Sequence, residues 1–205
     1  QLLLVPGPRR LDMENIPDLV TNRELALEAK SRILEAANRF LRRELPSDTR
    51  IIAISGRYEY RNKGLDIFLE ALGQLENSAY VGPPLMALVL VVGGYKDLIP
   101  SLRSDQAKAE TQAIPIATHR LDNESFDPIL QACNRLGLTN QAQNKVNVIF
   151  NPAYLNGHDG LFNMNYYEVL AGCDLGVFPS YYEPWGYTPL EAAAHAVPTV
   201  TTDQA

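Results

Sequence analysis

The sequence predicts an open α/β sheet, in which parallel strands are flanked by helices on both faces. Short strand-like segments alternate along the chain with amphipathic helical segments, which is the order that right-handed crossovers in a parallel sheet require. The two clearest strands, 51–54 and 85–92, are apolar throughout instead of alternating between apolar and polar residues. Such strands are typical of a sheet that is buried on both faces.

The first half of the chain contains two of these helix–strand pairs. Apolar residues recur at helical spacing over 18–45, and Pro46 ends that pattern. The β-branched run 51–54 predicts a buried strand, and leucines at helical spacing predict a helix over 65–75. The apolar run 85–92, closed by two glycines, predicts the next strand.

The second half begins with a segment of no clear period, 95–126, of which 104–113 has some helical character. Beyond it we expect helices over 127–136 (ended by Gly137), 166–172 and 189–196, and strands over 146–150, 175–178 and 199–201. Ligands of such sheets bind outside the carboxyl ends of the strands. This rule directs the search for a site to four segments: 55–63, 93–96, 151–156 and 179–188.

Composition excludes several classes of protein. The 205 residues include 18 Lys and Arg against 24 Asp and Glu, a formal net charge of −6, which argues against a general nucleic-acid binder. Cys133 and Cys173 have no CxxC partner and no nearby His pair, so we expect free thiols, no metal site and a cytoplasmic protein. No apolar run is long enough to span a bilayer, and no signal peptide is visible. Both ends look cut, so a piece of a longer polypeptide is expected.

The loop after 175–178 is the densest candidate for chemistry. We expect Thr188 to be the N-cap of the following helix, with Pro189 at its first position and Glu191 completing a capping box. The free amides around Gly186, Tyr187 and Thr188 would then form an anion site. Gly186 would let the backbone approach a diphosphate closely.

Glu183 and Glu191 lie on the two sides of this turn. Carboxylates beside a phosphate site are useful where they face hydroxyl groups, so a sugar is the natural ligand between them. The alternatives are that Glu191 only caps the helix and that Glu183 is a surface residue before a proline.

A second candidate segment, 55–64, carries Arg57 and Lys63 directly after a strand. Two cations at the sheet edge of an acidic protein suit a diphosphate leaving group whose charge must be neutralised without a metal ion. The alternative is that both are solvated loop charges. Glu59 could pair with either of them.

Aromatic residues form the third group of candidates. Tyr154 and Tyr166 follow the strand 146–150 and could stack on a base, with ordinary packing as the alternative. Trp185, in the loop described above, is counted among the donor-binding residues, although its ring is expected to pack and not to stack on a base. No P-loop, GxGxxG, GxSxG or HExxH motif is present, and the three histidines are isolated.

These segments together resemble the glycogen synthases of the animal and fungal type, which are retaining GT-B glycosyltransferases. The resemblance is strongest over 175–189, LGVFPSYYEPWGYTP, and continues in 57–60, 62–64, 127–130 and 146–150. It implies a fold of two facing Rossmann-like domains, with the nucleotide sugar held mostly by the C-terminal one. The chain would then comprise a linker and long helix over 1–49 and that nucleotide-sugar domain over 50–205.

The resemblance also implies roles for the candidate residues. Arg57 and Lys63 would bind the donor diphosphate and the developing leaving group. Glu183 would lie at the transferred glucose and Glu191 at the ribose hydroxyls. The resemblance places backbone groups of the helix start at the phosphates, namely those of Gly186, Tyr187 and Thr188. It places two aromatic side chains around the uracil, those of Tyr154 and Tyr166.

The implied reaction transfers glucose from UDP-glucose, or ADP-glucose, to the non-reducing end of an α-1,4-glucan, with no metal or other cofactor. The implied partner is the protein's own N-terminal Rossmann domain, which this chain lacks, and the oligomeric state is left open. Two alternatives stand beside this reading: another retaining GT-B transferase with a small acceptor, and a nucleotide-sugar-binding module without catalysis.

Overall fold

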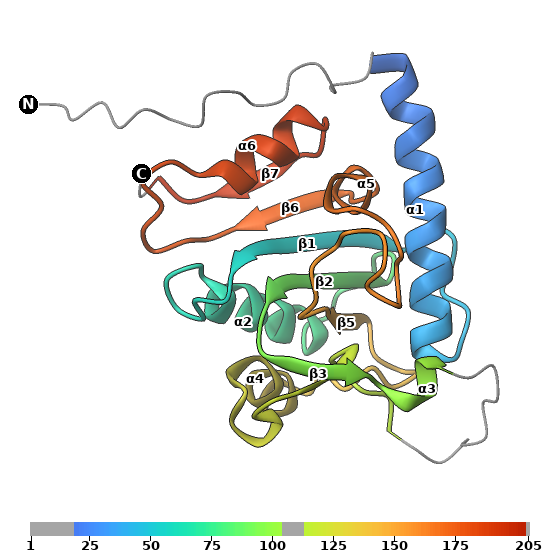
Figure 1. The fold of residues 1–205 in the computed structure, drawn as a ribbon, viewed down its shortest axis with the longest axis vertical. Coiled ribbons are helices and arrows are strands. Elements are labelled where there is room, and N and C mark those ends of the chain that lie inside the picture. The colour runs from blue at the N-terminus through green and yellow to red at the C-terminus, as the bar shows by residue number, and fades with distance from the viewer. Residues whose placement is uncertain (1–18, 104–112, 204–205) are drawn as a thin grey trace, which may run out of the picture.

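Five parallel strands form one sheet in the computed structural model, which describes residues 19–103 and 113–203 (Figure 1). The sheet order is β5-β2-β1-β6-β7. The strands are β1 (Arg50–Arg57), β2 (Leu85–Val92), β5 (Val146–Phe150), β6 (Leu175–Phe178) and β7 (Thr199–Thr201). The α/β Rossmann-like fold class is therefore confirmed.

The order of the strands reverses beside β1. The chain first builds outward from β1 through β2 to β5, then returns to the other side of β1 to add β6 and β7. The connection after β1 thus leads toward β2, whereas the connection after the neighbouring strand β6 leads the other way, toward β7. In open α/β sheets this switch point is where ligands bind.

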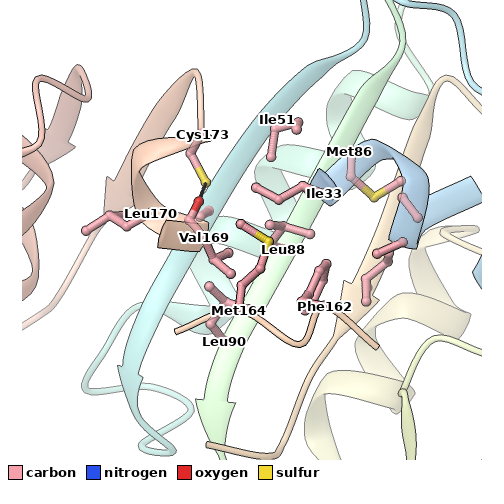
Figure 2. Packing of buried hydrophobic residues seen from close by; sticks show 14 of the residues in the cluster. Ile33, Ile51, Met86, Leu88, Leu90, Phe162, Met164, Val169, Leu170 and Cys173 are labelled. Carbon is pink, nitrogen blue, oxygen red and sulfur yellow. Dashed lines mark hydrogen bonds between the residues drawn. The ribbon is translucent and has the colours of Figure 1, made fainter. Parts of the chain in front are cut away.

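Helices cover both faces of the sheet. One core contains side chains of α1 (Leu19–Leu41) and α5 (Tyr166–Ala171), and the other contains side chains of α2 (Leu65–Glu76) and α4 (Pro128–Leu136). Figure 1 shows α1 running across the sheet near the amino ends of the strands, and Figure 2 shows the first core from close by. The sheet is therefore the middle layer of three.

The apolar run of β2 is explained by this layering. Met86, Leu88 and Leu90 belong to the core under α1 and α5, whereas the intervening Ala87, Val89 and Val91 belong to the core under α2 and α4. Because successive side chains of a strand point to opposite faces, a strand that is covered twice needs apolar residues at every position.

The segment 95–126 contains structure that the sequence pattern did not indicate. β3 (Tyr95–Leu98) and β4 (His119–Leu121) form an antiparallel pair, followed by a single turn of 3₁₀ helix at Glu124–Phe126; α3 (Pro100–Arg103) follows β3. The two strands are short and partly polar: an Arg120–Asp97 ion pair of 2.7 Å links them, and Leu121 of β4 packs into the core under α2 and α4. A hydrophobic period could not reveal them. Most of the segment 104–113, where the sequence pattern left a helix open, lies outside the described residues.

Helix boundaries follow local capping. Asp127 caps α4, because its Oδ1 accepts hydrogen bonds of 3.0 Å from the amides of Ile129 and Leu130, and Gly137 ends the helix with a φ of 76°. α1 ends at Leu41, short of the expected residue 45. The next residue, Arg42, has a φ of 54°.

The structure holds both thiols in the interior. Cys133 and Cys173 are free and buried, as expected. Burial raises the pKa of each thiol to about 12. Among the described residues, no helix combines the length and apolarity needed to cross a membrane.

Candidate functional site

Two loops meet at the switch point of the sheet: 58–64 after β1 and 179–186 after β6 (Figure 1). The Tyr181 amide donates to the Asn62 carbonyl at 3.0 Å, and the Tyr181 hydroxyl donates to Asp66 at 3.1 Å. Gly64 lies so close that a Cβ built on it would be 2.0 Å from the Pro179 carbonyl oxygen. The two loops therefore hold each other in one arrangement.

An ion pair crosses from one loop to the other. The Lys63 ammonium donates to the Glu183 carboxylate, and the two side chains are only 12 % and 21 % exposed. Glu183 is thus not the solvated surface carboxylate that the alternative supposed. The pair places one cation and one carboxylate, 120 residues apart in sequence, at the point where the fold class predicts a ligand.

Arg57 lies at the end of β1, on the same side of the molecule as this pair. Its side chain is 75 % exposed and forms a 3.0 Å ion pair with Glu59. Glu59 also accepts a 2.7 Å hydrogen bond from the Asn62 side chain. Glu59 therefore pairs with Arg57, while Lys63 pairs with Glu183.

The start of α6 (Tyr187–Ala194) differs from the expected capping box. Gly186 is the N-cap, with a φ of 69°, so Tyr187 and Thr188 are the first two helical residues. Thr188 as N-cap and Pro189 at the first position are therefore wrong, and Glu191, the fifth helical residue, does not cap the helix. The physical reason is the left-handed backbone at Gly186, which begins the helix two residues early.

The correction leaves the backbone argument for an anion site in place. First-turn amides such as those of Tyr187 and Thr188 lack acceptors within the helix, and the helix dipole favours negative charge there. A Cβ on Gly186 would lie 3.6 Å from Glu183 Cγ, so the carboxylate of the ion pair borders this helix start.

Glu191 contacts the start of α5. Its Oε1 accepts a 3.1 Å hydrogen bond from the Tyr167 hydroxyl. The preceding Tyr166 shares a 2.9 Å hydrogen bond with Ser55 Oγ on β1, and it packs against the core beneath α5. Burial raises the pKa of the Tyr166 phenol. The first turn of α5 thus links β1 to α6.

The other two aromatic candidates are more exposed. Tyr154 is 69 % exposed, in the loop after β5, and its neighbour Leu155 accepts a 3.1 Å hydrogen bond from the Tyr166 amide. Trp185 is 52 % exposed, with its ring centroid 6.3 Å from that of Tyr187.

The sequence argument missed three contacts at this edge. They are the Tyr167–Glu191 hydrogen bond, the Tyr166–Ser55 hydrogen bond, and the hydrogen bond from Tyr58 to Asp127, which anchors the loop after β1 to the N-cap of α4. Two consecutive tyrosines at a helix start were the available signal for the first two. Over residues 19–103 and 113–203, no three His, Cys, Asp or Glu side chains gather as they would around a metal ion.

The comparisons with known proteins agree on one family. A family model described as glycogen synthase matches residues 96–205. Human liver glycogen [starch] synthase is 33 % identical over 208 aligned residues, covering 76 % of this chain and 30 % of the relative. The chain belongs to the glycogen synthase family. The rat liver enzyme (32 %) and isoform 1 from Saccharomyces cerevisiae (28 % over 213 residues) are further relatives.

Membership of the glycogen synthase family confirms the resemblance read from the motifs. The chain spans about 30 % of the length of these relatives. The range matched by the family model contains Glu183, Glu191 and all of α6, but it begins after Arg57 and Lys63. For those two cations the geometry at the switch point is the main support.

Proposed function

We propose that this chain forms the donor-nucleotide half of a retaining glucosyltransferase. The enzyme transfers glucose from UDP-glucose to the 4-OH at the end of an α-1,4-glucan. The observation that carries the proposal is the Lys63–Glu183 ion pair between the loops after β1 and β6, beside the start of α6. Membership of the glycogen synthase family supports the reaction class.

In this proposal each group has one task. The donor diphosphate lies at the first amides of α6, where backbone dipoles favour an anion. Lys63 and Arg57 neutralise the charge that grows on the diphosphate as the bond from glucose C1 to the phosphate oxygen breaks. Glu183 accepts hydrogen bonds from the transferred glucose and Glu191 from the ribose, while Tyr166 and Tyr154 border the uracil and Trp185 lines the loop.

The ion pair implies an order of events when the donor binds. In the structure the Lys63 ammonium is neutralised by Glu183. A bound diphosphate competes for that ammonium, which frees the Glu183 carboxylate to accept sugar hydroxyls. Binding of the nucleotide half of the donor therefore prepares the group that meets the glucose half. Because cations on the protein neutralise the leaving group, the proposal requires no metal ion.

Replacing Arg57 or Lys63 by Ala tests this assignment. Each variant of the intact enzyme should lose at least about 10²-fold in turnover, the scale of losing a preorganised charge stabiliser. Arg135→Ala is the matched control for Arg57→Ala, because Arg135 also forms an exposed ion pair, with Glu70 on the α2–α4 face. Losses below about threefold for both variants would show that the two cations are misassigned.

Nucleotide titration separates this proposal from its alternatives. UDP should bind more tightly than ADP, and turnover with UDP-glucose and glycogen should persist in a chelator such as EDTA. A small-acceptor transferase would prefer another acceptor over glycogen, and a non-catalytic module would bind UDP without turnover. Either result would replace the proposed reaction while keeping the nucleotide site.

A further inference from the structure

The start of α5 presents two consecutive tyrosines whose hydroxyls bond to different elements. Tyr166 bonds to Ser55 of β1 and Tyr167 bonds to Glu191 of α6. Their backbone is fixed by a capping box, in which Asn165 accepts from the Glu168 amide at 3.0 Å and Glu168 accepts from the Asn165 amide at 2.7 Å. The position of both phenol groups is therefore set by a well-capped helix start.

The Tyr167 ring contacts two other rings. It stacks on His195, with centroids 5.2 Å apart and planes within 4° of parallel. Its centroid also lies 5.3 Å from that of Tyr166, with the two planes tilted by 58°. His195 is fixed in turn, because its Nδ1 donates to the Glu191 carbonyl at 2.9 Å. A carbonyl oxygen only accepts, so the His195 proton is on Nδ1.

Glu191 therefore accepts hydrogen bonds at both its backbone and its side chain. His195 binds its backbone carbonyl, and Tyr167 binds its carboxylate. A free glutamate on a helix surface loses rotamer entropy when a ligand orders it, and that loss weakens binding. A carboxylate already held by a phenol in a stacked, capped setting has lost most of that freedom before the ligand arrives.

We propose that Tyr167 is a positioning residue that holds the Glu191 carboxylate ready to accept the ribose hydroxyls of the donor, with His195 as its stacking partner. The inference rests on the proposed function, because it takes from it the role of Glu191 at the ribose. It adds two residues to that site. Neither of them touches the reacting atoms.

A purely structural role would have the same contacts, so the test must involve the ribose itself. We therefore compare UDP with 2′,3′-dideoxy-UDP, which lacks both hydroxyls, by calorimetric titration of the intact enzyme. Tyr167→Phe should weaken UDP binding roughly three- to tenfold, the scale of ordering one rotamer-rich side chain on binding, and leave the dideoxy ligand unchanged. KM for UDP-glucose should rise in parallel, with kcat changed less than twofold.

Two further variants separate the partners. His195→Ala removes both the stacked ring and the bond to the Glu191 carbonyl and should show part of the Tyr167→Phe loss, whereas His195→Phe keeps a ring for Tyr167 to stack on and should lose less UDP affinity than His195→Ala. The matched control is Tyr80→Phe, which removes a hydroxyl bonded to the Pro83 carbonyl at 3.0 Å in the loop before β2, at the opposite edge of the sheet. It should bind both ligands as the wild type does.

Each other outcome overturns the inference in a distinct way. An equal loss for both ligands in Tyr167→Phe would mean a structural role, and no loss would mean that Tyr167 does not position Glu191. Wild-type affinity for UDP in His195→Ala would remove His195 from the arrangement. A wild type that binds UDP and the dideoxy ligand equally would refute the ribose contact but keep the donor site. A wild type that binds no UDP would refute the proposed function as well.

Discussion

Gly64 shows at the scale of one residue how the site depends on close backbone approach. Its φ of 66° is in the left-handed region, and a Cβ would lie 2.0 Å from the Pro179 carbonyl oxygen and 2.5 Å from the carbonyl carbon. These atoms are backbone and cannot turn aside. We therefore expect Gly64→Ala to lower the free energy of unfolding by at least about 2 kcal/mol, combining backbone strain with displacement of the loop.

Gly137 provides the control for this prediction. Its φ of 76° is similar, but nothing lies within 4 Å of the Cβ position. Gly137→Ala should therefore cost only the left-handed strain, about 1 kcal/mol. Urea denaturation of both variants measures the difference, and equal losses would show that contact with Pro179 contributes nothing. Gly64→Ala should also weaken UDP binding, since the displaced loop carries Lys63.

The sequence predicted candidate residues for the site but not which of them contact each other. Lys63 and Glu183 were both candidates, because each follows a predicted strand at a sheet edge. Nothing in the pattern indicated that they neutralise each other, since strands β1 and β6 are neighbours only through the sheet order. The Tyr167–Glu191 bond was hidden for the same reason.

At the scale of elements, Asp174 ties α1 to the sheet. It accepts hydrogen bonds from the Lys30 ammonium at 2.6 Å, the Ile51 amide at 2.8 Å and Arg50 at 3.2 Å. Burial alone would raise the pKa of this carboxyl, but the bonds from Ile51, Lys30 and Arg50 outweigh it and hold the pKa below its ordinary value. The carboxylate thus fastens α1 and β1 at the amino edge of the sheet.

A lowered pKa in the folded state contributes stability above the unfolded value, near 3.9, and this stability is lost as the pH falls through the folded value. Asp174→Asn should therefore lower the free energy of unfolding by roughly 1–3 kcal/mol at pH 7, because the substitution removes hydrogen bonds to a charged carboxylate. The difference from the wild type should shrink below about pH 4. Asp48→Asn, at an exposed turn residue before β1, is the control. A difference that is the same at pH 3 and pH 7 would contradict the argument.

Helices and strands could be predicted where burial requires a recognisable pattern of apolar residues. The bounds of β2, β5, β6 and β7 agree with the sequence prediction, and for β2, β5 and β6 the reason is that their side chains pack into the cores on both faces of the sheet. The beginning of α6 was misplaced by two residues, since Thr, Pro and Glu mimic a capping box that the left-handed Gly186 makes unnecessary. The β3–β4 pair was missed because its strands have no apolar period.

At the scale of the whole molecule, a partly buried tyrosine packs against each of the two cores at the sheet's carboxyl edge. Tyr58 lies edge-on to Phe150 at 5.8 Å and donates to Asp127, while Tyr166 bonds to Ser55 above the other core. Burial raises the pKa of both phenols above their ordinary value, and for Tyr58 the bond to Asp127 raises it further. Each side of the sheet therefore contributes a phenol whose ionisation is disfavoured in the folded state.

These phenols predict how stability depends on pH in alkali. A group with a raised pKa in the folded state contributes its full stability below the unfolded value, near 10, and loses it as the pH rises above that value. The free energy of unfolding should therefore fall by about 1.4 kcal/mol per pH unit for each phenol above pH 10. Denaturation between pH 9 and 11 measures the slope, to which the two buried thiols also contribute. Tyr58→Phe and Tyr166→Phe should each flatten it, whereas Tyr182→Phe, at a ring that is 62 % exposed, should not. If the double variant kept the wild-type slope, alkaline unfolding would have to arise from other groups.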